Sequence, residues 1–92
     1  MTKISLGQFG AFLTGRSLAK QIVETHAAAG KLVAPITLDF QNVEAVTQSF
    51  MSELLVQLRA SGISLDAVTG ETKNTDIAKR LSTEIERLKH LP

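Results

Sequence analysis

The stretch that most constrains the fold is residues 35–58, where a short apolar segment leads through a polar loop into a longer amphipathic segment. Residues 36–40 are apolar except for Thr37 and Asp39, and this composition predicts a strand covered on both faces, as in a parallel sheet. Pro35 cannot donate a hydrogen bond to a neighbouring strand and therefore belongs at the start or edge of the strand. A strand, a loop and a helix in this order form half of a β-α-β unit, and sites in such sheets lie where strands end.

The part of the chain before this stretch predicts one strand and one helix. Residues 3–6 alternate between polar and apolar side chains, which favours a half-buried strand. Glycines then interrupt the alternation, and we expect Phe9, Phe12 and Leu13 to be apolar anchors of a tight turn with at most a short second strand. Apolar residues recur at helical spacing across residues 16–29, which predicts the first helix.

The part of the chain from residue 48 onward predicts two more helices and one more strand. Residues 48–61 form the second helix. Its apolar stripe consists of Phe50, Met51, Leu54, Leu55 and Leu58. Alternation across residues 63–68 favours a strand, and residues 69–74 form a polar loop that we expect to be the most mobile segment. Residues 75–90 form the third helix, with Asn74 as its N-cap.

The complete pattern is a β-α-β-α-β-α order within a single domain, residues 1–92. Helices between successive strands require parallel crossover connections. The expected class is therefore α/β, with a mainly parallel sheet and packed helices. A hydrophobic content of 43% and a charged content of 21% are ordinary for a globular domain, so we expect one shared core.

Charge, cysteine content and hydropathy exclude several classes of function. The formal net charge is only +1, from 10 basic and 9 acidic residues, which gives nucleic-acid binding little electrostatic support. The chain has no cysteine, which excludes a disulfide framework and a thiolate site. No apolar stretch approaches the ~18 residues of a membrane span, and the N-terminus lacks a secretion signal. We expect a soluble cytoplasmic protein that does not bind membranes.

Few residues suggest chemistry, and no catalytic set, metal site or cofactor motif is complete. Asp39, near the end of the expected strand, is a candidate metal ligand or general base. No histidine or second carboxylate lies close to it in sequence, so a role in shaping the following turn is preferred. Arg16 opens the first helix and is a candidate anion-binding or interface residue. His26 and His90 are far apart, and neither has another ligand type at metal spacing.

Ser49 is the sharper candidate because it falls in the first turn of the second helix. A phosphate on its hydroxyl would add about −1.5 to −2 charges beside free backbone N–H groups and the positive end of the helix dipole, where an anion is stabilised. The competing interpretation is that Thr47 or Ser49 simply caps the helix, which needs no modification. Spacing alone favours plain capping.

The segment from residue 14 to residue 58 resembles the STAS family, the domains of anti-sigma-factor antagonists. In these antagonists a strand ends in Asp and a Val follows four residues later. The next helix begins with Asp-Ser-Ser-Gly, whose second Ser is phosphorylated. Asp39, Val43 and Ser49 stand at the corresponding positions of this chain.

The resemblance is closer to a small bacterial STAS-like branch, whose motifs are Arg-x-x-Ala in the first helix, Asp-Phe followed by Val, and Ser-Phe at the start of the second helix. The residues that match these motifs are Arg16, Ala19, Asp39, Phe40, Val43, Ser49 and Phe50. The chain departs from the antagonists at three positions. Thr47 and Gln48 replace their Asp-Ser pair, and Phe50 replaces their Gly.

The resemblance implies a STAS-like fold and a non-enzymatic signalling or adaptor module that binds a partner protein. The partner class that it implies is a kinase or other anti-sigma-like regulator, or an ATPase-type sensor protein, and the implied switch is phosphorylation of Ser49. We expect the partner to bind the loop and the start of the second helix, with Ser49-Phe50 meeting it. The residues of this expected surface are Asn42, Glu44, Thr47, Gln48 and Ser49.

Two other functions remain open from the sequence. One is a structural subunit of a homo-oligomer or hetero-oligomer, in which Leu88 and Leu91 of the third helix pack on another chain. The other is an enzyme or nucleotide-binding protein that uses Asp39 and Arg16. No cofactor is expected in the favoured interpretation.

Overall fold

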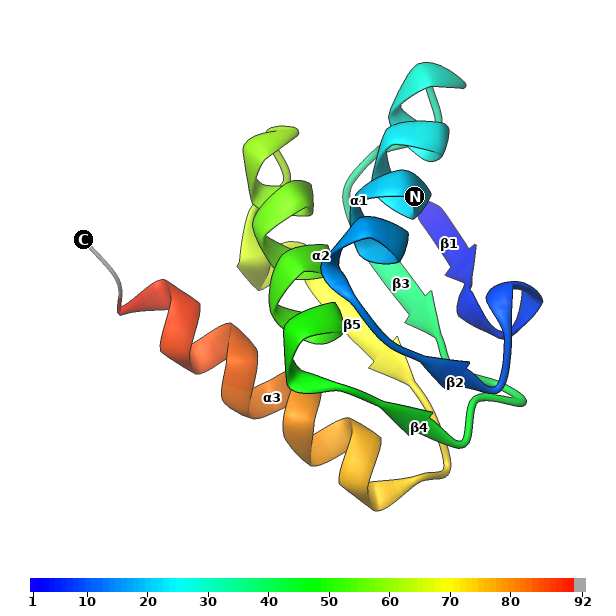
Figure 1. Ribbon diagram of the computed structural model, residues 1–92. Coiled ribbons are helices and arrows are strands. Elements are labelled where there is room, and N and C mark those ends of the chain that lie inside the picture. The colour runs from blue at the N-terminus through cyan, green and yellow to red at the C-terminus, as the bar shows by residue number, and fades with distance from the viewer. Residues whose placement is uncertain (91–92) are drawn as a thin grey trace.

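A sheet of three parallel strands forms one layer of the molecule in the computed structural model, which describes residues 1–90 (Figure 1). Its strands are β1 (Thr2–Ser5), β3 (Ile36–Asp39) and β5 (Val68–Glu71), with β3 in the middle. Both pairings are parallel, and the side chains of the three strands lie in register. The expected α/β class with a mainly parallel sheet is confirmed.

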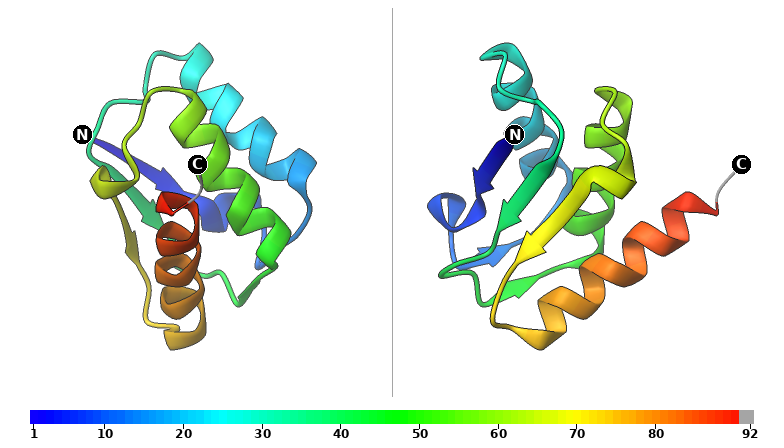
Figure 2. Two further views of the ribbon diagram at one scale, coloured as in Figure 1. Left: turned by 90° about the vertical axis from the view of Figure 1, so that its left-hand side faces the viewer. Right: turned by 180° about the vertical axis from the view of Figure 1, so that it is seen from behind.

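Three helices form the second layer: α1 (Arg16–Ala28), α2 (Gln48–Ala60) and α3 (Thr75–Lys89). α1 packs beside α2, and α3 packs against α2 and β5. The views in Figure 2 show the strands as one layer, with the helices gathered on one face of it. Each helix starts at the residue that the sequence predicts and ends one residue earlier, so the helical assignments are confirmed.

A short second ladder joins the N-terminal segment to the start of α2. It consists of β2 (Phe12–Leu13) and β4 (Ala45–Val46), which pair in parallel. A single 3-10 turn, Leu6–Phe9, leads from β1 towards β2. The short second strand agrees with the expectation from sequence, whereas β4 was not predicted. Because β4 is only one residue away from α2, this ladder holds the first turn of α2 in place.

The other face of the three-stranded sheet is polar. Its two register rows are Lys3, Thr37 and Thr69, and Ser5, Asp39 and Glu71. These six residues are exposed or partly exposed, whereas the alternate residues Ile4, Ile36, Leu38 and Val68 are buried on the helical side. The expectation that β3 is covered on both faces is therefore wrong. Thr37 and Asp39 interrupt its apolar run because their face meets water rather than a helix.

The core lies between the helices and the inner face of the sheet. All five side chains of the predicted α2 stripe, Phe50, Met51, Leu54, Leu55 and Leu58, have no exposed surface. Their burial contributes on the order of 10 kcal/mol as an upper bound, at about 1.5–3 kcal/mol for each side chain. The α2 helix is thus the element on which the core is built.

The strand expected at residues 63–68 begins later in the chain. Ser64 Oγ accepts a hydrogen bond from the backbone N–H of Asp66 (3.3 Å), and this cap starts a 3-10 turn, Leu65–Ala67. The strand is β5, and it includes residues that were expected to form a mobile loop. The strand assignment is wrong for residues 63–67, and the loop assignment is wrong for residues 69–71, because a side-chain cap and the free edge of β3 decide the backbone here. The alternation of apolar residues reveals neither the cap nor the free edge.

Phe9 and Phe12 are not the apolar anchors that the sequence suggests. Their side chains are 39% and 65% exposed, whereas Leu13 is completely buried. Successive residues of a strand point to opposite sides, so Phe12 faces outward because Leu13 takes the inward position on β2. The expectation is confirmed for Leu13 alone.

Asn74 is the N-cap of α3, as predicted, because its Oδ1 accepts hydrogen bonds from the backbone N–H groups of Asp76 (2.9 Å) and Ile77 (3.2 Å). We expect Asn74→Ala to lower the free energy of unfolding by about 1 kcal/mol. In a domain of this size that loss lowers Tm by about 4–8 °C, measured by thermal circular dichroism. Asn74→Asp keeps the acceptor oxygen and loses only the bond from Asn74 Nδ2 to the Glu44 carbonyl, so it is expected to lose less stability than Asn74→Ala. Equal losses in both variants would show that the cap is not the cause.

The remaining expectations concern the C-terminal helix and membranes. Leu88, which was considered for contact with another chain, is 3% exposed and packs inside the molecule, and Leu91 lies outside the described residues. Within residues 1–90, no helix combines the length and the apolar composition that crossing a bilayer requires.

Candidate functional site

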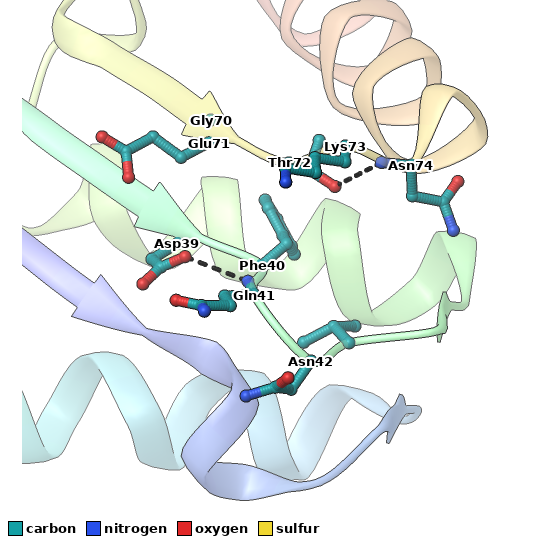
Figure 3. Close-up of a pocket in the computed structure, with 10 residues that line it drawn as sticks. Asp39, Phe40, Gln41, Asn42, Gly70, Glu71, Thr72, Lys73 and Asn74 are labelled. Atoms are coloured by element: carbon teal, nitrogen blue, oxygen red, sulfur yellow. Dashed lines mark hydrogen bonds between the residues drawn. The ribbon is translucent and has the colours of Figure 1, made fainter.

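A cavity with a volume of about 880 Å³ lies at the carboxyl ends of β3 and β5 (Figure 3). We call it the carboxyl-edge pocket. Its lining residues are Asp39, Phe40, Gln41, Asn42, Val43, Gly70, Glu71, Thr72, Lys73 and Asn74. This position is the one where open α/β sheets place their ligands, so the strand end singled out in the sequence borders a real cavity.

One wall of the carboxyl-edge pocket is a turn shaped by Asp39. Asp39 Oδ1 accepts a hydrogen bond from the backbone N–H of Gln41 (3.0 Å), which Figure 3 shows as a dashed line. The next residue, Asn42, has a φ of 70°, a left-handed conformation that asparagine tolerates better than most residues. The backbone N–H of Val43 then donates to the carbonyl of Phe40 (2.9 Å), which closes the turn.

The opposite wall comes from β5 and the loop before α3. The backbone N–H of Phe40 donates to the carbonyl of Glu71 (2.9 Å), which extends the β3–β5 ladder to the rim of the pocket. Thr72 Oγ1 accepts a hydrogen bond from the backbone N–H of Asn74 (3.0 Å). Asn74 Nδ2 also donates to the carbonyl of Glu44 (3.2 Å), so the N-cap of α3 ties this wall to the loop before β4.

The two carboxylates of the carboxyl-edge pocket share one cation. Lys3 Nζ lies 3.2 Å from Glu71 Oε2 and 3.8 Å from Asp39 Oδ2. The hydrogen bond to Glu71, followed by the charges of Glu71 and Asp39, raises the pKa of Lys3 above its ordinary value. The lysine partly neutralises both acids, and in the described part of the chain no group of three or more His, Asp or Glu side chains is placed to hold a metal ion. The pocket is therefore suited to polar contacts.

At the start of α2, the residues Thr47, Ser49 and Phe50 have three different environments. Thr47 is the N-cap, because its Oγ1 accepts a hydrogen bond from the backbone N–H of Phe50 (3.3 Å). Ser49 is partly exposed, and its Oγ lies 3.4 Å from Thr47 Oγ1. Phe50 is completely buried. The expectation that Ser49-Phe50 meets a partner is therefore wrong for Phe50, which faces the core.

A second cavity of about 400 Å³, the arginine hollow, borders Ser49. Its lining residues are Arg16, Gln48, Ser49, Ser52 and Arg87, which belong to α1, α2 and α3. Arg16 Nη1 lies 3.3 Å from Glu53 Oε1, which joins the start of α1 to α2. A hydrogen bond from Gln57 and then the contact with Arg16 hold the pKa of Glu53 below its ordinary value, although burial acts in the opposite direction. The anion or interface candidate Arg16 thus lies beside the phosphosite candidate Ser49.

A buried network beneath the arginine hollow was missed by the sequence analysis. Glu84 is only 3% exposed and accepts hydrogen bonds from Arg87 Nη2 (2.9 Å) and Gln48 Nε2 (3.3 Å). Arg87 Nη2 also donates to Ser52 Oγ (3.1 Å), and the bond to Glu84 raises the pKa of Arg87. Helical spacing could have found Glu84, because it lies three residues after Leu81 on the buried stripe of α3.

The expected surface residues connect the two cavities. Asn42 lines the carboxyl-edge pocket, whereas Gln48 and Ser49 line the arginine hollow. Glu44 and Thr47 lie between them in sequence, and both are exposed. The backbone N–H of Glu44 donates to the carbonyl of Ala11 (2.7 Å), and that of Thr47 donates to the carbonyl of Leu13 (3.0 Å), which hold this segment on the β2 side.

The two histidines stay outside this arrangement. His26 Nδ1 lies 2.8 Å from the carbonyl of Ile22 within α1, and His90 Nε2 lies 3.5 Å from Glu86 Oε2 at the end of α3. Neither lines any of the cavities described here. Each histidine thus contacts a residue four positions earlier in the chain.

A comparison with protein families identifies the chain. The model of a family described as a STAS-like domain of unknown function (DUF4325) matches residues 15–69, more than half of the 92 residues. The chain belongs to this STAS-like family. No curated protein and no solved structure matches the STAS-like chain. The matched range includes Arg16, Asp39 and Ser49, whereas the whole of α3 lies beyond it.

Proposed function

We propose that this STAS-like domain is a non-enzymatic signalling or adaptor module that binds a partner protein. The proposed surface follows the loop before α2 and the first turn of that helix. Its residues are Asn42, Glu44, Thr47, Gln48 and Ser49. The observation that carries the proposal is that neighbouring residues of this turn have different roles. Thr47 provides the cap and Phe50 the core contact, so the Ser49 hydroxyl is left for another role.

The surroundings of Ser49 support a switch by phosphorylation. Arg16 and Arg87 line the same hollow as the serine. A phosphate would add about −1.5 to −2 charges, which two nearby guanidinium groups and the first turn of a helix both stabilise. Because the cap depends on Thr47, modification of Ser49 would leave the helix start intact.

The proposed partner is a kinase or other anti-sigma-like regulator, or an ATPase-type sensor protein, as the resemblance to STAS antagonists implies. The proposal places both proteins in the cytoplasm, and a chain without cysteine suits such a reducing compartment. The polar loop and the paired carboxylates of the carboxyl-edge pocket support recognition in preference to catalysis.

Pull-down of the tagged protein from its native cells, comparing wild type with Ser49→Asp and Ser49→Ala, tests the proposal. We expect the same partner with wild type and Ser49→Ala, and about tenfold weaker binding by Ser49→Asp, because a fixed negative charge changes this surface. Ser17→Asp is the matched control, since Ser17 is the second residue of α1 as Ser49 is of α2. Identical partners and affinities for all variants would rule out the switch, and no recovered partner would count against the module.

A further inference from the structure

A third cavity adjoins the arginine hollow through a shared residue. Its volume is about 420 Å³, and Gln48 lines both cavities. The residues that line it are Gln48, Asp76, Lys79, Arg80, Thr83 and Glu84. We call the two adjoining cavities together the basic groove, which runs from the start of α1 past the first turn of α2 and along α3.

The basic groove concentrates positive charge. Its four cations are Arg16, Lys79, Arg80 and Arg87, and all four side chains are exposed. Only two carboxylates line it, the buried Glu84 and the exposed Asp76. Its lining residues therefore carry a formal charge of +2, and Glu53, which lies outside the lining, pairs with Arg16 and offsets one of these charges. A partner of opposite charge is what this surface complements.

Part of this positive charge has no carboxylate partner. The sequence places Asp76 four residues before Arg80, yet in the described part of the chain neither Lys79 nor Arg80 forms an ion pair. Arg87 uses Nε and Nη2 for Glu84 and Ser52, and its Nη1 has no hydrogen-bond partner among residues 1–90. Donors therefore remain for an external anion.

The spacing of the cations defines the shape of the occupant. Asp76, Arg80, Thr83 and Arg87 recur at intervals of three and four, so they follow one face of α3. Two helical turns separate Arg80 from Arg87, a rise of about 10 Å. An extended chain advances about 3.3 Å per residue, so about three to four residues span this distance. Glu84 holds Arg87 in place before binding, which reduces the entropy lost when an anion docks.

We propose that the basic groove binds an acidic, extended segment of a partner protein, whose carboxylates pair with Lys79, Arg80, Arg87 and Arg16. This inference rests on the proposed function, because Ser49 lies in the same groove. It adds the chemistry of the partner and extends the binding surface onto α3, beyond the range matched by the family model. A carboxylate or phosphate at Ser49 would compete with such a segment.

The test uses a fluorescein-labelled peptide of alternating glutamate and serine, titrated with the full-length protein and followed by fluorescence anisotropy. We compare wild type with Lys79→Gln/Arg80→Gln. The matched control is Lys20→Gln/Lys31→Gln, which removes the same charge from exposed positions outside the groove. Thermal unfolding of each variant establishes that it is folded. The expected result is binding that weakens at least about fivefold in the groove variant only, and that weakens for all proteins when salt rises from ~50 to ~150 mM.

Three outcomes would overturn the inference: no binding of the peptide by wild type, equal loss in both double variants, or tighter binding of a DNA duplex than of the peptide. The last outcome would assign the groove to nucleic acid. The peptide experiment needs no native partner, so its failure is distinct from failure of the pull-down. A partner recovered in a Ser49-dependent way, together with no peptide binding, would retain the module and remove the acidic segment.

Discussion

Phe50→Ala is expected to lower the free energy of unfolding by about 3–5 kcal/mol. Phe50 has no exposed surface, and it lies in the first turn of α2, which supplies more buried apolar side chains than any other element. A domain of this size has a total stability of about 5–15 kcal/mol, so the loss removes a large share of it. Chemical denaturation followed by circular dichroism measures the change, and Tm is expected to fall by more than about 10 °C.

Two controls separate the core role of Phe50 from partner binding. Phe50→Leu keeps an apolar side chain and is expected to cost clearly less than Phe50→Ala. Ser49→Ala, one residue away, is expected to change stability by no more than about 0.5 kcal/mol because Thr47 provides the cap. A Phe50→Ala protein that unfolds like wild type would show that this side chain does not anchor the core.

Gly7→Ala is expected to destabilise the protein by about 2–3 kcal/mol. A Cβ atom at Gly7 would lie 2.2 Å from the carbonyl oxygen of Gln41, a backbone atom that cannot move without its turn. The turn at Gln41 forms one wall of the carboxyl-edge pocket, so the substitution strains the site as well as the fold. We expect a decrease in Tm on the order of 10 °C in a thermal scan.

The neighbouring Gln8→Ala substitution is the control for Gly7→Ala. Gln8 is exposed and lies in the same 3-10 turn, so its replacement is expected to alter stability by less than about 0.5 kcal/mol. Nuclear magnetic resonance spectra are expected to show the largest chemical-shift changes of Gly7→Ala at residues 39–43. Shifts confined to the 3-10 turn itself would contradict the close packing of these two segments.

The proposed surfaces have one feature in common. Each is held by contacts between elements that are far apart in the sequence. The turn at Asp39 packs on Gly7, and Asn74 donates to the carbonyl of Glu44. Glu84 connects Gln48 of α2 to Arg87 of α3. Hydrogen bonds between distant elements therefore hold both the loop before α2 and the basic groove. A buried ion pair such as Glu84–Arg87 is better understood as orienting the arginine than as a source of stability.

The sequence predicted the helices best, because their signals are local. The apolar stripe of α2 and the Asn74 cap of α3 each follow from residues three or four positions apart. The prediction of a strand at residues 63–68 was wrong because a segment becomes a strand only where a distant strand pairs with it. The β5 strand exists where β3 offers free hydrogen-bonding groups, and nothing in residues 63–71 reveals that edge.

The candidate site divides in the same way. Asp39 at the end of a strand and Ser49 in the first turn of a helix follow from local spacing, and so does the resemblance to the STAS family, which the family model confirms over residues 15–69. The convergence of Arg16, Lys79, Arg80 and Arg87 on one groove depends on how α1 and α3 pack around α2. Arg16 and Lys79 are more than sixty positions apart in the sequence, so no periodic pattern connects them.

The sequence by itself determined the helices, the parallel α/β class and the polar junction before α2, because hydrophobic periodicity and capping act over a few residues. Only the tertiary structure decided which residues of that junction are available. It buried Phe50, exposed Phe12 and placed Ser49 in the same cavity as two arginines. Burial and charge clustering arise when distant segments pack together, and that packing is a property of the assembled core rather than of any one segment.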